Sequence, residues 1–192
     1  MTSADGNQAT PAGATPTPYA GPASYAGPAS FQLDAAGSAV SISHKTMWGL
    51  AHVRGSFSKL SGSAEILADG SARGRFEIDA ASIDTKNAQR DKHLKSADFF
   101  NAADHPQIVV DLTQAAAQGS DRVSTAGTLT VAGQTRPLSL TATITEATEQ
   151  AITLRAEADI DRADFGMGWN RLGMISGPAH VNVVARYVRT PA

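Results

Sequence analysis

The residues best suited to chemistry lie in the stretch "RDKHLKSADFF", residues 90–100, which holds five charged side chains, a histidine and two adjacent phenylalanines. His93 titrates near neutral pH and the Asp91 carboxylate can orient it, so Arg90, Asp91 and His93 are candidates for general acid and base catalysis. The sequence places no nucleophile or second base beside them. We therefore favour an ion-pair and capping network that fixes a helix, and we predict no catalytic residue.

The sequence lacks the residue patterns of disulfides, hydrolases, nucleotide-binding loops and metal sites. The chain has no cysteine, which excludes disulfides, thiolate nucleophiles and cysteine-type zinc sites. No Gly-x-Ser-x-Gly elbow and no Gly-Lys pair is present, so neither a hydrolase elbow nor a Walker A loop is predicted. Four further histidines lack the spacing of metal ligands: His44, His52, His105 and His180. We predict no metal and no cofactor.

Most of the chain that would position these residues alternates polar and apolar side chains, the period of strands with one buried face. The segments "SAVSISH", "ARGRFEIDA", "QIVVDLT", "AITLRAEADID" and "AHVNVVARYVR" show it most clearly. The residues expected to face inward are Val40, Ile42, Phe76, Ile78, Ile108, Val110, Leu112, Ile152, Leu154, Ala156, Ala158, Ile160, Val181, Val183, Ala185 and Tyr187.

The clearest hairpin is "VSTAGTLTVAGQTRPLSLTATIT", in which we expect a type II′ turn at Gly133-Gln134. Eight or nine strands joined mostly by short turns favour an up-and-down antiparallel barrel, with a sandwich as the alternative. The inward positions include many small residues: Gly55, Gly74, Gly127, Ala142, Ala156, Ala158 and Ala185. These indicate either a cavity inside the barrel or relief of strand curvature at its corners.

Two segments interrupt the alternation. Residues 45–53, "KTMWGLAHV", are expected to form a short helical turn with Met47, Trp48 and Leu50 facing inward. Residues 85–106 are rich in helix formers and end at a proline, so a helix is expected there, packed across an open end of the barrel or along its wall. Phe99 and Phe100 would then plug or line the interior.

The first thirty residues differ from the rest. They contain five of the nine prolines and the tandem repeat "YAGPAS", which predicts a disordered tail before a barrel domain over residues 31–192. No basic segment followed by an apolar run opens the chain, so we expect a cytoplasmic protein, or a periplasmic or secreted one where a native signal has been removed. A net charge of −2 argues against nucleic-acid binding, and no run is long and apolar enough for stable membrane insertion.

Four segments together resemble the YceI-like family of lipid-binding barrels. They are "SISHKTMWGLAHVRGSF" (41–57), "SIDTKNAQRDKHLKSADFFNAADHPQIV" (82–109), "GTLTVAGQTRPLSL" (127–140) and "DRADFGM" (161–167). The resemblance implies an extended lipocalin-like antiparallel barrel whose apolar tunnel accepts a polyisoprenoid, an isoprenoid quinone or another long-chain amphiphile. It also suggests a homodimer.

We therefore predict an all-β barrel of about eight strands, capped by one or two short helices, that binds and carries such a ligand without being an enzyme. The residues expected to line the tunnel or its mouth are Ile42, Trp48, Phe57, Phe76, Ile78, Arg90, His93, Leu94, Phe99, Phe100, Ile108, Val110, Leu129, Leu140, Leu154, Phe165 and Trp169. The candidate partners for a polar head group are Arg90, His93, Ser43, Thr85 and Asn170. Two alternatives stay open: an enzyme that acts on such a lipid through His93 and Asp91, and a ligand-free interaction module that uses the tail.

Overall fold

The computed structural model describes residues 27–46, 51–169, 175 and 177–191, and within them eleven strands form one antiparallel sheet. The strands are β1 (Ala29–Leu33), β2 (Ala39–Thr46), β3 (Ala51–Phe57), β4 (Leu60–Ile66), β5 (Ala72–Asp79), β6 (Ile83–Asp84), β7 (Gln107–Gln118), β8 (Arg122–Val131), β9 (Gln134–Ala147), β10 (Ala151–Ile160) and β11 (Ala179–Arg189). The helices are α1 (Ala88–Leu94) and two 3-10 helices, η2 (Ala80–Ser82) and η3 (Arg162–Phe165).

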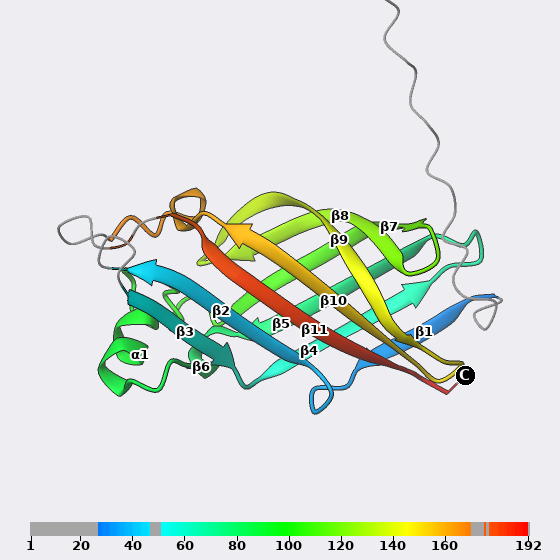
Figure 1. Cartoon of the computed structure of the whole chain (residues 1–192), viewed down its shortest axis with the longest axis horizontal. Helices are drawn as coiled ribbons and strands as arrows, with labels where there is room; N and C mark the ends of the chain where they lie inside the picture. Colours follow the sequence, from blue (N-terminus) through cyan, green and yellow to red (C-terminus); the bar gives the residue numbers. More distant parts are fainter. Residues whose placement is uncertain (1–26, 47–50, 170–174, 176, 192) are drawn as a thin grey trace, which may run out of the picture.

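The sheet closes on itself because β11 pairs with β1 along one part of its length and with β2 along another. β1 and β2 share one position in the wall, β3 and β4 share the next, and β5 and β6 share the third. With β7 to β11 following in order, the wall has eight positions in an up-and-down arrangement. Figure 1 shows an elongated barrel with α1 at one end and the C-terminus at the other. The expected antiparallel barrel is confirmed, and the sandwich alternative is wrong.

The β8–β9 turn differs from the expected one by a single residue. Val131 pairs with Gln134, so the two loop residues are Ala132 and Gly133, with φ of 48° and 75°. Positive φ at both positions is the type I′ turn, whose twist matches that of the flanking strands. The expected type II′ turn at Gly133-Gln134 is therefore wrong, because the hairpin register places Gln134 in the strand.

The described parts of the two segments expected to be helical contain one short helix. β2 continues through Lys45 and Thr46, and β3 begins at Ala51, so the two ends of segment 45–53 are paired strand; Met47, Trp48 and Leu50 lie outside the described residues. In segment 85–106 the helix covers only Ala88–Leu94. The Ser96 hydroxyl donates to the His93 carbonyl at 2.7 Å, and Asn101 has φ of 45°, so the chain leaves the helix and continues in turns.

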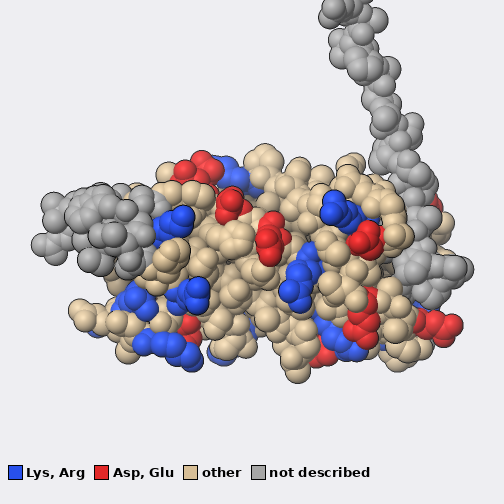
Figure 2. All heavy atoms as spheres, in the orientation of Figure 1, with Lys and Arg blue, Asp and Glu red and all other residues tan. Residues whose placement is uncertain are grey.

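β1 begins at Ala29, two residues before the expected start of the barrel domain, and the Ala29 side chain is buried. Residues 1–26 of the expected tail lie outside the described residues. Acidic and basic side chains lie interspersed on the face shown in Figure 2. Some charged side chains form ion pairs between neighbouring strands, as Arg73 of β5 does with Glu65 of β4. In the described part of the chain, no helix has the length and apolar character needed to cross a membrane.

Large side chains that are fully enclosed are scarce in the barrel interior. Among the described residues, Val40 is the largest whose side chain keeps less than 2% of its surface exposed. Inward-facing residues of β7, β9, β10 and β11 such as Val110, Leu140, Leu154 and Val183 are only partly buried, although they point away from solvent along their strands. Since alternation sends these residues inside, their remaining exposed surface must face an internal space.

Candidate functional site

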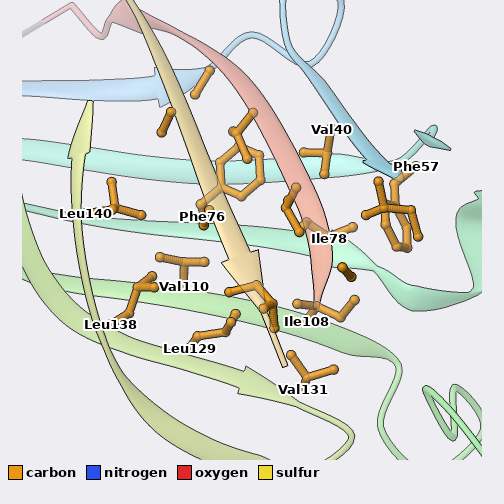
Figure 3. A pocket seen from close by; sticks show the side chains of 18 of the residues that line it. Val40, Phe57, Phe76, Ile78, Ile108, Val110, Leu129, Val131, Leu138 and Leu140 are labelled. Carbon is orange, nitrogen blue, oxygen red and sulfur yellow. The ribbon is translucent and has the colours of Figure 1, made fainter. Parts of the chain in front are cut away.

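A cavity of about 920 Å³ occupies the inside of the barrel. Figure 3 shows ten labelled side chains from β2, β3, β5, β7, β8 and β9 around this space: Val40, Phe57, Phe76, Ile78, Ile108, Val110, Leu129, Val131, Leu138 and Leu140. The lining residues of β11 are Ala179, Val181, Val183, Ala185 and Tyr187. These cover eight residue steps, about 26 Å at 3.3 Å per residue, so the cavity is an elongated tunnel.

Small inward residues make room for the tunnel. Ala142, Ala156, Ala158, Ala185 and Gly74 all line it, so the structure favours a cavity over a filled interior at these positions. Two other small residues, Gly55 and Gly127, have a different reason. A Cβ at Gly55 would lie 2.8 Å from the Thr85 methyl group, and one at Gly127 would lie 1.9 Å from a carbonyl oxygen of β7, beside the bulge in that strand. Close packing, rather than the cavity, requires glycine there.

One end of the tunnel is covered by α1 and the turns that follow it. Leu94, Phe99 and Phe100 pack against the buried residues of the barrel and line the tunnel. The Phe100 ring meets that of Phe57 edge to face, with centroids 5.8 Å apart. The segment that opens with Arg90 is therefore a cap over the tunnel, held down by apolar side chains.

A hydrogen-bond network centred on Thr85 fixes this cap. The Asp91 carboxylate accepts from the Thr85 hydroxyl and from its backbone N–H, the latter at 2.9 Å. Arg90 Nε donates to the Thr85 hydroxyl oxygen at 2.7 Å, and Arg90 Nη2 donates to the Thr85 carbonyl at 2.8 Å. Thr85 keeps only 4% of its surface exposed. The network ties α1 to the end of β6, as the structural interpretation of Arg90 and Asp91 predicts, but through Thr85 rather than by a direct ion pair.

His93 does not pair with Asp91, which contradicts the arrangement needed for the proposed acid and base set. Its Nε2 lies 3.0 Å from the carboxylate of Asp98, a residue that follows the end of α1 in the chain. Its ring meets those of Phe99 and Trp169 edge to face, with centroids 5.0 and 4.5 Å apart. His93 is thus part of an aromatic cluster at the tunnel mouth.

His44 also lines the tunnel, near the same end. Its Nε2 is buried and has no hydrogen-bond partner among the described residues. A hydrogen bond to Pro178 involves the ring, and because proline has no N–H, the imidazole donates to the Pro178 carbonyl. Burial lowers the pKa of His44, against the effect of this hydrogen bond, and the nearby positive charge of Arg162 lowers it further.

Arg162 links the His44 region to the aromatic cluster. Its Nη1 donates to the Met167 carbonyl at 2.9 Å and to the Trp169 carbonyl at 2.7 Å, and the side chain borders the tunnel. At the opposite end the Tyr187 side chain lines the tunnel, and burial raises the pKa of its hydroxyl. Most side chains of the tunnel wall are aliphatic or aromatic; the polar residues near α1 are Asn87, Gln89, Arg90 and His93, and Arg73, Thr125 and Tyr187 line the wall elsewhere.

Fifteen of the seventeen residues expected at the tunnel or its mouth lie in its wall: Ile42, Phe57, Phe76, Ile78, Arg90, His93, Leu94, Phe99, Phe100, Ile108, Val110, Leu129, Leu140, Leu154 and Trp169. Phe165 of η3 is instead buried in the apolar core and does not line the tunnel. Trp48 lies outside the described residues. Contact of these residues with a ligand stays a prediction.

The candidate partners for a polar head group separate in the structure. Arg90 and His93 reach the tunnel wall, whereas Thr85 is buried and uses its hydroxyl within the capping network. Ser43 faces a second hollow of about 560 Å³, and Asn170 lies outside the described residues. Sequence reasoning placed neither His44 nor Arg162 at the tunnel, although it considered and rejected His44 as a metal ligand. His44 shares the strand phase of Val40 and Ile42, which could have indicated it, but Arg162 sits in a short helix that gave no signal.

Within the described residues, no three His, Asp or Glu side chains are grouped so that they could hold a metal ion.

Comparison with known proteins agrees with this architecture. A family model described as a YceI-like domain matches residues 31–187. A UPF0312 protein of Vibrio cholerae is 30% identical over 118 residues, which cover 58% of this chain and 61% of that protein. Protein YceI of Escherichia coli is 45% identical over 65 residues, 34% of each chain. The chain thus matches less than two thirds of the length of these curated relatives.

Two solved structures share the fold. BcnA of Burkholderia cenocepacia superposes with a TM-score of 0.72 at 21% identity, covering 80% of this chain and 98% of BcnA. A polyisoprenoid binding domain from Saccharophagus degradans, implicated in plant cell wall breakdown, superposes with a TM-score of 0.69 at 20% identity. The superposition covers 83% of this chain and 98% of that domain.

Proposed function

Because the chain belongs to the YceI-like family and encloses an apolar tunnel, we propose that it binds a long-chain apolar ligand there and carries or sequesters it unchanged. The ligand classes we infer are polyisoprenoids, isoprenoid quinones and fatty-acid-like amphiphiles. The observation that carries the proposal is the tunnel itself, which is lined mostly by aliphatic and aromatic side chains. The Saccharophagus degradans domain of similar fold, described as polyisoprenoid binding, supports the ligand class.

The energetics of burial favour a long chain. Each buried methylene contributes about 0.8 kcal/mol, whereas association costs an estimated 4–15 kcal/mol. A chain of about six carbons therefore gains too little to bind well, while about fifteen or more carbons reach micromolar affinity with a single polar anchor. A tunnel wall of about 26 Å along β11 matches such a chain.

The arrangement at the mouth supports binding rather than catalysis. The Asp91 carboxylate is engaged by two donors from Thr85, and His93 lies among aromatic rings with Asp98 as its carboxylate partner. A general base must reach the proton that it abstracts, and here the charged groups of the cap serve to hold it in place. We also propose a homodimer, on the family resemblance alone; light scattering of the purified chain measures it.

The test is native mass spectrometry of freshly purified protein, followed by organic extraction and identification of the released compounds. We expect one long-chain lipid per barrel, and reloading of the stripped protein by that lipid. A preparation that carries no lipid and takes up neither a C20 isoprenoid alcohol nor a C16 fatty acid refutes the proposal and favours an interaction module. Chemical conversion of the bound lipid by wild type, lost in His93→Ala with lipid binding kept, would establish the enzyme alternative instead.

A further inference from the structure

The tunnel wall contains a buried hydroxyl group that has no partner in the described part of the protein. Tyr187 is the last lining residue of β11 and keeps only 7% of its surface exposed. Its hydroxyl forms no hydrogen bond with the described residues, and burial is the cause that raises its pKa. A buried polar group without a partner lowers the stability of the fold, so native proteins rarely keep one without a reason.

The Tyr187 hydroxyl is open to the tunnel. Among the described side chains, His44 Nε2 is the polar atom that is unpaired and also fully enclosed by protein. The Tyr187 hydroxyl is unpaired as well but is not fully enclosed, so it keeps surface that a water-sized molecule can reach. Tyr187 shares the inward strand phase of Val183 and Ala185, and this surface therefore faces the tunnel.

The other polar side chains of the described wall differ from Tyr187. Six of them form hydrogen bonds with the protein: Arg73, Asn87, Arg90, His93, Thr125 and Arg162. Gln89 is exposed and Trp169 is partly exposed, so water can serve both. Tyr187 alone in this part of the wall combines burial, an unpaired polar atom and access from the tunnel.

The chemistry of the missing partner follows from the phenol group. Because burial raises the pKa of the Tyr187 hydroxyl, the group keeps its proton at neutral pH. Its O–H is a donor that lacks an acceptor. A carbonyl or hydroxyl oxygen on a neutral ligand accepts this hydrogen bond, whereas a hydrocarbon leaves the O–H unpaired.

We propose that Tyr187 is the head-group contact of the tunnel and that its hydroxyl donates a hydrogen bond to a neutral oxygen at one end of the long-chain ligand. This inference rests on the proposed function, because it concerns the ligand that the tunnel binds. Tyr187 lies about 26 Å along β11 from Ala179, and Figure 1 shows β11 ending away from α1. The ligand oxygen therefore lies at the tunnel end away from α1, and the chain extends toward the cap.

The test compares heptadecan-2-one with heptadecane, which has a methylene group in place of the carbonyl. Each compound is delivered from methyl-β-cyclodextrin and displaces the apolar dye N-phenyl-1-naphthylamine from lipid-free full-length protein, either wild type or Tyr187→Phe. We expect Tyr187→Phe to lower the ketone affinity about tenfold, the size of one buried hydrogen bond, and to change the alkane affinity less than about threefold. Because each ligand is compared between two proteins, the different water solubilities of ketone and alkane cancel.

The matched control is Thr125→Val. Thr125 also lines the tunnel and carries a hydroxyl, but that hydroxyl donates to the Leu140 carbonyl at 3.1 Å. Its removal should change the ketone and alkane affinities by the same factor, within about threefold. The infrared carbonyl stretch of the bound ketone gives a second readout: it should lie at the lower frequency of a hydrogen-bonded carbonyl in wild type and at that of a free carbonyl in Tyr187→Phe.

Equal changes in ketone and alkane affinity on Tyr187→Phe overturn the head-group contact while leaving lipid binding intact. A selective loss of ketone affinity in Thr125→Val as large as that in Tyr187→Phe also overturns it. If neither compound displaces the dye from wild type, the proposed function itself fails. Should Tyr187→Phe not fold, the infrared band in wild type still decides, because the frequency of a free carbonyl there contradicts the contact.

Discussion

Obstructing the tunnel at its midpoint separates a true cavity from a filled barrel. Ala156 lines the tunnel and pairs with Val183, the middle one of the β11 lining residues. From Val183 the lining extends four residue steps to Ala179 and four to Tyr187, about 13 Å each way at 3.3 Å per residue. The substitution Ala156→Phe places a benzyl group across the tunnel at this level.

The expected loss of ligand affinity in Ala156→Phe follows from the part of the ligand chain that the new ring keeps out of the tunnel. A chain of about sixteen carbons that enters from the α1 end loses burial of about eight methylenes, an upper limit of about 6 kcal/mol at about 0.8 kcal/mol each. We expect the affinity to fall by at least about 100-fold, since part of the chain can refold within the free half. Folding should change little, by less than about 1 kcal/mol, because the ring enters empty space; the same ring in a packed core costs about 1–3 kcal/mol.

The assay pairs dye displacement by chains of about ten and about twenty carbons with urea unfolding of each variant. The long chain should lose affinity and the short chain should change less than about threefold, since it fits within one half of the tunnel. Arg155→Phe is the control, because Arg155 is exposed on the outer face of the same strand. Unchanged binding of the long chain by Ala156→Phe, combined with a loss of 2 kcal/mol or more in the free energy of unfolding (about the cost of overpacking), would refute the tunnel.

Three further predictions concern single contacts. Thr85→Val removes the hydroxyl that joins Arg90 to the cap network and should lower the free energy of unfolding by about 2 kcal/mol, whereas Thr85→Ser should cost less than about 1 kcal/mol. Gly127→Ala should cost about 3 kcal/mol, because its Cβ would lie 1.9 Å from a carbonyl oxygen, whereas Gly74→Ala, with its nearest atom at 3.4 Å, should cost less than about 1 kcal/mol. Wild type should lose stability relative to His44→Phe as pH falls below 6.5, because the folded state holds the His44 pKa below that ordinary value and the unfolded chain therefore binds the proton first.

Urea titrations measure all three, the last repeated between pH 7.5 and pH 5. A Thr85→Ser variant less stable than Thr85→Val would show that the methyl group, not the hydroxyl, matters at this position. A fully stable Gly127→Ala would contradict the close approach of the strands. Parallel pH curves for wild type and His44→Phe would show that the His44 ring titrates as it does in water.

The alternation of side chains predicted the barrel wall well because each strand needs only local information. Along β11, Val181, Val183, Ala185 and Tyr187 were assigned inward from a period of two, and the structure places all four in the tunnel wall. The same reasoning failed at the ends of strands. Whether the β8–β9 turn begins at Ala132 or at Gly133 depends on which residues pair across the hairpin, and the type of a turn residue does not determine that register.

The path of the cap was predicted less well than the strands of the barrel wall. Helix formers across residues 85–106 predicted one helix, yet α1 ends at Leu94 because Ser96 and Asn101 offer the backbone other hydrogen bonds and a left-handed turn. This shorter helix is what brings Phe99 and Phe100 back over the tunnel. Local propensity indicated where the chain leaves the sheet, while packing against the barrel decided the path that it takes.

The polar groups of the site were the least accessible to sequence reasoning, for a physical reason. Arg90, Asp91 and His93 stand together in the chain and suggested a reactive cluster, but a helix turns Asp91 toward Thr85 and His93 toward Trp169. His44 and Arg162 are far apart in the chain, and only closure of the barrel brings the Arg162 charge close enough to lower the His44 pKa. Groups that are distant in the sequence come together only in the closed barrel, so the sequence predicts the apolar wall of the tunnel more readily than the polar side chains that border it.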